Sequence, residues 1–191
     1  SATLEFAKPI AVTSPEAKDL LGNALISLDV LSDAQLHAVS LAIRAFEKNR
    51  AFLLGDGTGV GKGRQSMGVI AAHWKRGARR ALVVSAGNLA TDVQRDFKAC
   101  KMKRLYPGVK FYDASAKLPA LTKHQSAVIF TTYTQLRSKG AKVYAKLLKG
   151  ESAGTIVLDE VHKGTSNKKS LTFRAVQDLL DICKESPLLA M

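Results

Sequence analysis

Two stretches of this sequence carry the residue types that phosphate chemistry needs, and the first is a glycine-rich turn. It reads GDGTGVGKGR over residues 55–64 and follows the apolar run AFLL. Glycine lets a backbone come close to a polyanion and adopt positive φ angles. The helix predicted to begin near Lys62 would aim its unpaired N–H groups at the same point, and Lys62 adds a mobile positive charge for the outer phosphates. The turn therefore predicts a nucleotide-binding loop formed by Asp56, Gly57, Thr58, Gly59, Val60, Gly61, Lys62, Gly63 and Arg64.

The turn departs from the strict phosphate-binding pattern directly after its lysine. That pattern places Ser or Thr there, and the hydroxyl oxygen binds Mg²⁺, whereas this sequence has Gly63. A magnesium ion at the turn would have to complete its octahedron with water or another ligand. Thr58 and Ser66 are the nearby hydroxyls. A tight structural turn is the alternative interpretation of the stretch taken alone.

The second stretch is the acidic pair in GTIVLDEVH, residues 154–162. Asp159 and Glu160 end a continuous apolar strand, which is where open α/β sheets bind ligands. In nucleotide hydrolysis Asp159 would hold Mg²⁺ through water, and Glu160 would orient and deprotonate the attacking water. The pair alone is also compatible with an acidic N-cap. Both stretches together, in this order within one α/β unit, favour a nucleotide hydrolase.

Positioning these residues requires alternating strands and helices, which the sequence predicts. Residues 31–49 indicate a helix, with Ser32 as N-cap and apolar residues at helical spacing. Strands are predicted at 51–55, 81–86, 109–113, 127–132, 155–159 and 187–191, and further helices at 62–75, 89–100, 134–149 and 171–183. Their alternation predicts an α/β fold of three layers, with a mostly parallel central sheet flanked by helices.

The balance of charge favours a polyanionic partner. The chain has 191 residues, a formal net charge of +13 at pH 7 and a sequence pI near 9.9. Nucleic acid is the favoured class of partner. The clusters KRGARR (75–80) and KMKR (101–104) are candidate phosphate contacts, with a solvated basic surface as the alternative.

Cysteine usage and hydropathy indicate the compartment. Cys100 and Cys183 stand far apart in no metal-ligand spacing, so we expect free thiols in a reducing environment. The sequence shows no secretory signal and no apolar run near the ~18 residues that a membrane span requires. A soluble, intracellular chain with no membrane partner is expected.

DEVH has the DExH form of superfamily-two helicases and translocases, and other stretches resemble segments of those proteins. LSDAQ is similar to the segment in which a glutamine, here Gln35, contacts the adenine edge. VVSAGNLATDVQRDF, with Ser85 and Asn88, resembles a stretch that grips the phosphate backbone of nucleic acid. VIFTTYTQL, with Thr132 and Tyr133, resembles the later TYxxL segment.

More narrowly, FLLGDGTGVGKGRQ together with DEVHKGTSNKKS resembles the Strawberry notch family of helicase-like proteins, over residues 31–191. That family's loop reads G-x-G-V-G-K-G-R and its acidic motif D-E-x-H-K, so a glycine after the lysine is the family's own pattern. Gly164 and the run TSNKK depart from the family's tighter Ala-Lys-Asn run.

The resemblance implies the first RecA-like lobe of a two-lobed, nucleic-acid-dependent ATPase with ATP and Mg²⁺ as cofactors. It makes Lys62, Asp159 and Glu160 catalytic and has His162 couple the site to the second lobe. Lys168 and Lys169 are candidate nucleic-acid contacts because the run NKK follows the acidic strand. It also implies transcription-regulatory partners and, for a eukaryotic source, the nucleus. Backbone phosphate contacts carry no base information, so DNA and RNA both stay open.

The expected organisation is an irregular leader at 1–30 and the lobe at 31–191, ending before a Ser-Ala-Thr strand. The second lobe, with its arginine finger, would be absent, so the lobe by itself should turn ATP over hardly at all. Two alternatives remain: a catalytically weak nucleic-acid-binding scaffold, which Gly63 favours, and a different P-loop enzyme, which Gln35 disfavours.

Overall fold

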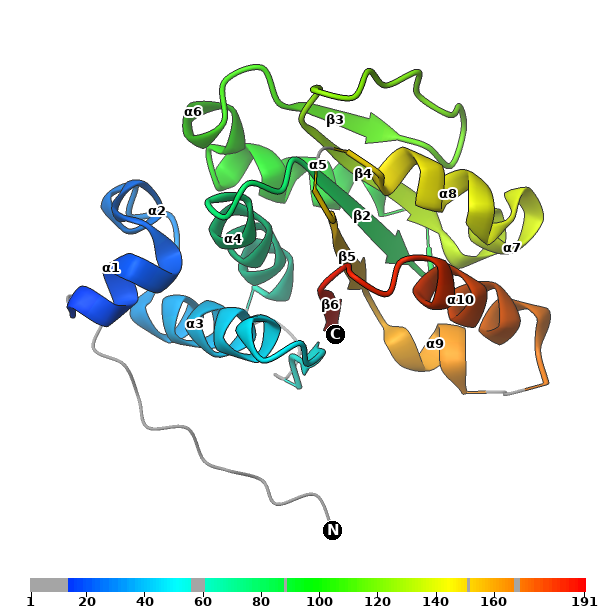
Figure 1. Cartoon of the computed structure of the whole chain (residues 1–191), viewed down its shortest axis with the longest axis horizontal. Coiled ribbons are helices and arrows are strands. Elements are labelled where there is room, and N and C mark those ends of the chain that lie inside the picture. The colour runs from blue at the N-terminus through cyan, green and yellow to red at the C-terminus, as the bar shows by residue number, and fades with distance from the viewer. Residues whose placement is uncertain (1–13, 56–60, 88, 151, 167–168) are drawn as a thin grey trace, which may run out of the picture.

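The computed structural model describes residues 14–55, 61–87, 89–150, 152–166 and 169–191. Within these ranges six strands form one sheet in the order β1-β6-β5-β2-β4-β3, and all neighbouring strands are parallel (Figure 1). The strands are β1 (Phe52–Leu53), β2 (Arg80–Ser85), β3 (Lys110–Asp113), β4 (Ala127–Thr132), β5 (Thr155–Leu158) and β6 (Leu188–Ala190). The central strands β2, β4 and β5 are buried almost throughout, as expected for apolar strands covered on both faces.

Helices cover both faces of the sheet (Figure 1). One face carries α1 (Pro15–Leu21), α2 (Asn23–Ser27), α3 (Asp33–Glu47), α4 (Lys62–Trp74), α5 (Ala90–Ala99) and α6 (Met102–Leu105). The other face carries α7 (Tyr133–Lys139), α8 (Ala141–Leu148) and α10 (Leu171–Ile182), with α9 (Val161–Thr165) beside α10. The three-layer α/β prediction is therefore confirmed.

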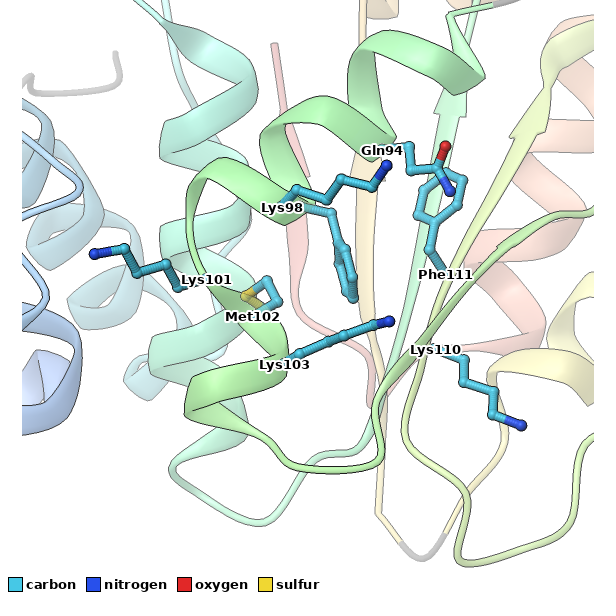
Figure 2. A pocket seen from close by; sticks show the side chains of 8 residues that line it. Gln94, Lys98, Lys101, Met102, Lys103, Lys110 and Phe111 are labelled. Atoms are coloured by element: carbon cyan, nitrogen blue, oxygen red, sulfur yellow. The ribbon is translucent and has the colours of Figure 1, made fainter.

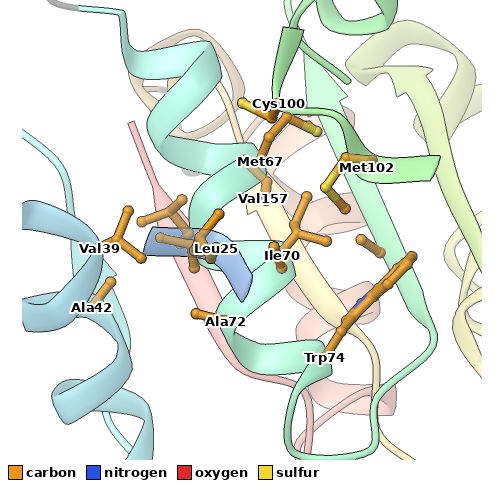
Figure 3. Close-up of a cluster of buried hydrophobic side chains, with 14 of the residues drawn as sticks. Leu25, Val39, Ala42, Met67, Ile70, Ala72, Trp74, Cys100, Met102 and Val157 are labelled. Carbon is orange, nitrogen blue, oxygen red and sulfur yellow. The ribbon is translucent and has the colours of Figure 1, made fainter. Parts of the chain in front are cut away.

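The larger apolar core surrounds α4, which packs against the sheet on one side and against α1, α2 and α3 on the other (Figure 3). Met67, Ile70 and Trp74 of α4 are fully buried there. The Trp74 indole donates from Nε1 to the Arg80 carbonyl at 3.2 Å, and its ring meets that of Tyr106 edge-on with centroids 5.2 Å apart. Trp74 is thus a packing residue, and the core fixes the direction in which α4 leaves the sheet edge.

The prediction of an irregular leader at 1–30 is wrong for its described part, because Pro15–Leu21 and Asn23–Ser27 are helical. Ser14 caps α1, accepting from the Ala17 amide at 3.1 Å, and Pro15 occupies the first helical position, which suits its fixed φ. Leu20 and Leu25 are buried against the core. The segment is too short for a clear apolar period, so its helices depend on this packing.

The prediction of a single helix at 134–149 is also wrong, because two helices occupy this segment. Gly140, at φ 88° and ψ 147°, separates α7 from α8, and α7 begins at Tyr133 with Thr132 as its cap. Glycine adopts this positive φ without steric cost. The break lets both helices pack against α10 on the second face of the sheet.

Candidate nucleotide site

The carboxyl ends of the strands meet at one edge of the sheet, and the described residues of both predicted stretches lie there. Leu53 ends β1 ahead of the glycine-rich turn, and Leu158 ends β5 directly before the acidic pair. β6 pairs with both of these strands, and Met191, directly after β6, lines one cavity with Gly63 of the turn and Asp159 of the acidic pair. Because parallel sheets bind ligands beyond the carboxyl ends of their strands, this edge is the candidate nucleotide site.

Some of the predicted site residues fall outside the described ranges. They are Asp56, Gly57, Thr58, Gly59 and Val60 of the turn, and Asn88 and Lys168 among the nucleic-acid contacts. Their roles stay predictions. The described part of the turn begins at Gly61.

The start of α4 is built around Gly61 and Gln35. Gly61 is the N-cap of α4 in the left-handed region, at φ 78° and ψ 38°, and Lys62 is the first helical residue. A β-carbon at position 61 would lie 2.5 Å from Gln35 Nε2. Glycine is therefore required twice here, by the backbone conformation and by the approach of the glutamine amide.

Gln35 also belongs to the start of α3. Its backbone amide donates to Ser32 Oγ at 3.3 Å, and its Oε1 accepts from the Ser32 amide at 3.0 Å, which is a capping box. A groove of about 570 Å³ opens beside it, between α3 and β1, with Ser32, His37, Leu54 and Gly55 in its walls. This volume is in the range of small-molecule pockets. Gln35, the predicted adenine contact, lines this groove.

Gly61→Ala is expected to cost more stability than an alanine at another left-handed glycine. Gly108, at φ 85° with open space around its β-carbon position, is the matched control. Gly108→Ala should lower the free energy of unfolding by about 1–2 kcal/mol, the cost of a left-handed alanine, whereas Gly61→Ala must also displace Gln35. Denaturant titration of both variants gives the difference, and equal losses would contradict the described contact.

Asp159 is held by its neighbours on the sheet edge. Its Oδ2 accepts from Ser85 Oγ at 2.9 Å, and its carbonyl accepts from the Tyr133 hydroxyl at 2.9 Å. Burial, and then the charges of Asp159 and Glu160, raise the pKa of Tyr133, which therefore stays a hydrogen-bond donor. Ser85 and Tyr133 thus position the acidic strand end, and their predicted contact with nucleic acid stays a prediction.

Glu160 stands in an unusual backbone conformation beside a lysine that sequence reasoning missed. It caps α9 at φ 48°, a left-handed angle uncommon outside glycine and frequent at functional sites. Lys163 Nζ donates to its Oε2 at 2.6 Å. This bond, together with the charges of Lys163, His162 and Lys62, lowers the pKa of Glu160. The carboxylate is therefore ionised at neutral pH, and the i,i+3 spacing of Glu160 and Lys163 was the signal available in the sequence.

A carboxylate from α5 lies where a side chain at position 63 would project. A β-carbon at Gly63 would lie closer than 3.0 Å to Asp96 Oδ2, so the two cannot occupy this space together. Asp96 and Asp159 line the same cavity of about 240 Å³. Sequence reasoning missed Asp96, because no local pattern pairs residues of two different helices.

The remaining predicted residues lie around this edge. Thr132 Oγ1 accepts from the Gln135 amide at 3.1 Å and caps α7, and Arg64 is exposed in the first turn of α4. His162, in α9, and Lys169, ahead of α10, are also exposed. The contacts predicted for these residues with a second lobe, a nucleotide or nucleic acid stay predictions.

The residues of the basic cluster at 75–80 form contacts within the fold. Lys75 and Arg76 form ion pairs with acidic residues of α1 and α3. Arg79 donates to the Trp74 carbonyl at the end of α4 and to the Ala78 carbonyl beyond it, and Arg80 is buried where β2 begins. These contacts, at the sheet edge opposite the candidate site, favour a structural role over contact with phosphates.

The second cluster, KMKR, lies beside a pocket of about 430 Å³ formed by α5, α6 and β3. Figure 2 shows Lys98 and Lys103 extending across this pocket, whereas Lys101 and Lys110 point away from it. Lys110 begins β3, so the pocket also lies toward the edge where the strands begin. Contact between this cluster and phosphates stays a prediction.

The fold and the candidate site are those of a P-loop NTPase. It belongs to the family described as P-loop containing NTP hydrolase pore-1, whose model matches residues 2–186.

Relatives of known name confirm the resemblance to Strawberry notch proteins. Protein strawberry notch homolog 2 of Mus musculus is 33% identical over 165 residues, covering 78% of this chain and 12% of that protein. Homolog 1 of Homo sapiens is 32% identical over 206 residues, covering 93% and 15%, and strawberry notch of Drosophila melanogaster is 33% identical over 152 residues, covering 70% and 9%. The chain therefore spans a small part of the length of these relatives.

Solved structures confirm the RecA-like fold. The SWI2/SNF2 ATPase core of Sulfolobus solfataricus in complex with dsDNA has a TM-score of 0.60 at 19% identity, over 82% of this chain and 30% of that one. The UvsW helicase of bacteriophage T4 has a TM-score of 0.50 at 15% identity, over 78% and 50%. Among the described residues, no helix has the length and apolarity to cross a membrane.

Proposed function

We propose that this chain is the ATP-binding lobe of a nucleic-acid-dependent, DExH-type ATPase that hydrolyses ATP with Mg²⁺ to move along or remodel nucleic acid. The observation that carries the proposal is that the start of α4 and the acidic pair meet at one sheet edge, where Gly63 and Asp159 line the same cavity. A tight structural turn would not need an oriented acidic pair beside it.

The described residues fit a nucleotide with its metal. Gly61 is the N-cap of α4. The N-terminus of a helix is a favourable place for phosphate, and Lys62 adds its charge there. Ser85 donates to Asp159 Oδ2 and orients this carboxylate. Carboxylate oxygens are ligands that suit magnesium. When bound, Mg²⁺ would neutralise the charge that develops on the phosphates.

Each described residue then has a distinct role. Lys62 binds the phosphates, Asp159 holds the metal, and Gln35 faces the base from the groove beside α3. Glu160 is the base that orients the attacking water and accepts its proton. Its lowered pKa keeps it in the deprotonated form that this role requires.

Nucleic acid is the proposed track, and two observations support it. The net charge of +13 suits a polyanion, and one structural neighbour is described in complex with dsDNA. A role in transcription regulation and a nuclear location extend the same proposal for a eukaryotic source, since the relatives named above are eukaryotic.

The direct test is steady-state ATP hydrolysis by the complete protein that carries this lobe. It is assayed without nucleic acid and with single-stranded DNA, duplex DNA and RNA, at low and moderate salt, because phosphate contacts weaken as salt rises. Stimulation by one polymer, lost in Lys62→Ala, is the expected result. A folded protein that binds nucleic acid and hydrolyses ATP on none of them would instead favour the catalytically weak scaffold.

A further inference from the structure

The structure offers a replacement for the hydroxyl that the phosphate loop lacks. The Asp96 carboxylate, from α5, fills the space into which a Ser or Thr side chain at position 63 would project. Glycine at 63 is thus the residue that lets α5 pack on the start of α4 with this carboxylate between the two helices. The hydroxyl oxygen that the loop lacks and the carboxylate oxygen that Asp96 supplies would occupy the same place.

The nearby hydroxyl of Ser66 is already engaged. Its Oγ donates to the Gly63 carbonyl at 2.7 Å within the first turn of α4, and the residue is 2% exposed. Asp96 is different, because it lines a cavity of about 240 Å³ that Asp159 also lines. Asp92 of α5 lines this cavity as well, but it is ion-paired with Arg95 at 2.9 Å. Asp96 and Asp159 therefore bring carboxylates from two separate segments to one cavity at the nucleotide edge.

The Asp96 carboxylate is poorly solvated and weakly paired. Its side chain is 16% exposed, and Arg95 Nε lies 3.9 Å from its Oδ1. Burial raises the pKa of Asp96, and the charge of Asp92 adds to the rise, whereas Arg95 and Arg64 act in the opposite direction. A cation in the shared cavity would offset this desolvation.

We infer that Asp96 is a ligand of the nucleotide-bound Mg²⁺, supplying the protein oxygen that the residue after the loop lysine usually provides. Magnesium sites of this kind combine one or two carboxylates with phosphate oxygens and water, which matches the pair Asp96 and Asp159. The inference rests on the proposed function and deepens it, by identifying how the metal is held at a loop that ends in Lys62-Gly63.

Asp96 also lies near the N-terminus of α4, where a negative charge stabilises a helix. A residue that only stabilised α4 would affect the free energy of unfolding and not the contribution of magnesium to nucleotide binding. The test therefore measures the second quantity directly.

The experiment determines the Kd of the chain for a fluorescent ADP analogue in MgCl₂ and in EDTA. The ratio of the Kd in EDTA to the Kd in MgCl₂ reports the contribution of magnesium. For Asp96→Asn, which keeps the shape of the side chain, the ratio should fall by roughly 10–100-fold, the effect typical of metal-site residues, while the Kd in EDTA stays near that of the wild type. Asp92→Asn is the matched control, because Asp92 lies one turn earlier on α5, lines the same cavity and is ion-paired with Arg95 at 2.9 Å.

A double-mutant cycle strengthens the test. Gly63→Ser alone should lose the magnesium contribution, because the new side chain collides with Asp96. Asp96→Ala alone removes the oxygen. The double variant Gly63→Ser/Asp96→Ala restores a hydroxyl and the space for it, so its ratio should recover toward the wild-type value. Such non-additivity is expected only if both residues serve the same position.

Failure of this inference differs from failure of the proposed function. A wild-type chain that binds the analogue in neither buffer overturns both. A wild-type chain that binds more tightly with magnesium, while Asp96→Asn keeps the same ratio, overturns the inference alone. Melting temperatures of all variants show whether each is folded, and a lower melting temperature for Asp96→Asn at an unchanged ratio assigns Asp96 to the stability of α4 only.

Discussion

Glu160→Gln is expected to lower ATP turnover by the complete protein by roughly 10²–10⁴-fold, the usual contribution of general base catalysis, while the affinity for ATP stays close to that of the wild type. Glutamine keeps the size of the side chain and can still bond to water, but it cannot accept a proton. Because Lys163 and Lys62 hold the pKa of Glu160 below its ordinary value, the wild-type residue is ionised throughout the neutral range. The substitution therefore removes proton acceptance and little else.

The measurement is single-turnover hydrolysis together with nucleotide binding, under the condition of highest activity. Glu185→Gln is the matched control, since Glu185 is exposed and precedes β6 at the opposite edge of the sheet. Turnover by Glu160→Gln equal to that of the wild type would remove Glu160 from its role. Loss of binding as well as turnover would assign it to nucleotide affinity.

Arg80→Met is expected to lower the free energy of unfolding by roughly 3–5 kcal/mol, because it leaves buried carbonyls without a donor, each at a cost of about 1–3 kcal/mol. Arg80 is 1% exposed, and its guanidinium donates to the carbonyls of Gln125 at 2.6 Å, Leu147 at 2.7 Å and Thr122 at 2.6 Å. Burial lowers the pKa of Arg80, yet a guanidinium stays charged at neutral pH. Methionine keeps much of the apolar stem and loses every donor.

The carbonyls of Gln125 and Leu147 account for most of this loss. The Thr122 carbonyl also accepts from the Gln125 amide at 3.1 Å and so keeps one donor. Denaturant-induced unfolding measures the loss. Lys103→Met, an equal change of charge at an exposed position, should alter stability by less than about 0.5 kcal/mol. Similar values for the two variants would show that the Arg80 contacts contribute nothing to stability.

Comparison of the two basic clusters shows where local sequence stops being informative. KRGARR and KMKR have similar composition, and from the sequence both could contact phosphates or solvent. In the structure, Arg80 is buried at the start of β2, whereas Lys101 and Lys103 lie at the rim of a surface pocket. Burial of a charged residue depends on which carbonyls surround it, and those of residues 122, 125 and 147 come from segments far away in the chain.

The sequence by itself determined the fold class and the two stretches that carry the chemistry. Apolar runs and helical periodicity are local properties of a sequence. Each strand from β1 to β6 was therefore predicted, as were α3, α4, α5 and α10 within a few residues. The turn ending in Lys62-Gly63 and the pair Asp159-Glu160 are recognisable because their function requires particular residues at adjacent positions.

Only the tertiary structure decided how these parts meet. Strand order places β6 between β1 and β5, brings Ser85 and Tyr133 onto Asp159, and packs α5 so that Asp96 lies against Gly63. The helices at 15–27 likewise depend on a core contributed by α3 and α4. These contacts join residues that are distant in the chain, and their energies arise from packing and burial, which no local pattern of residue types specifies.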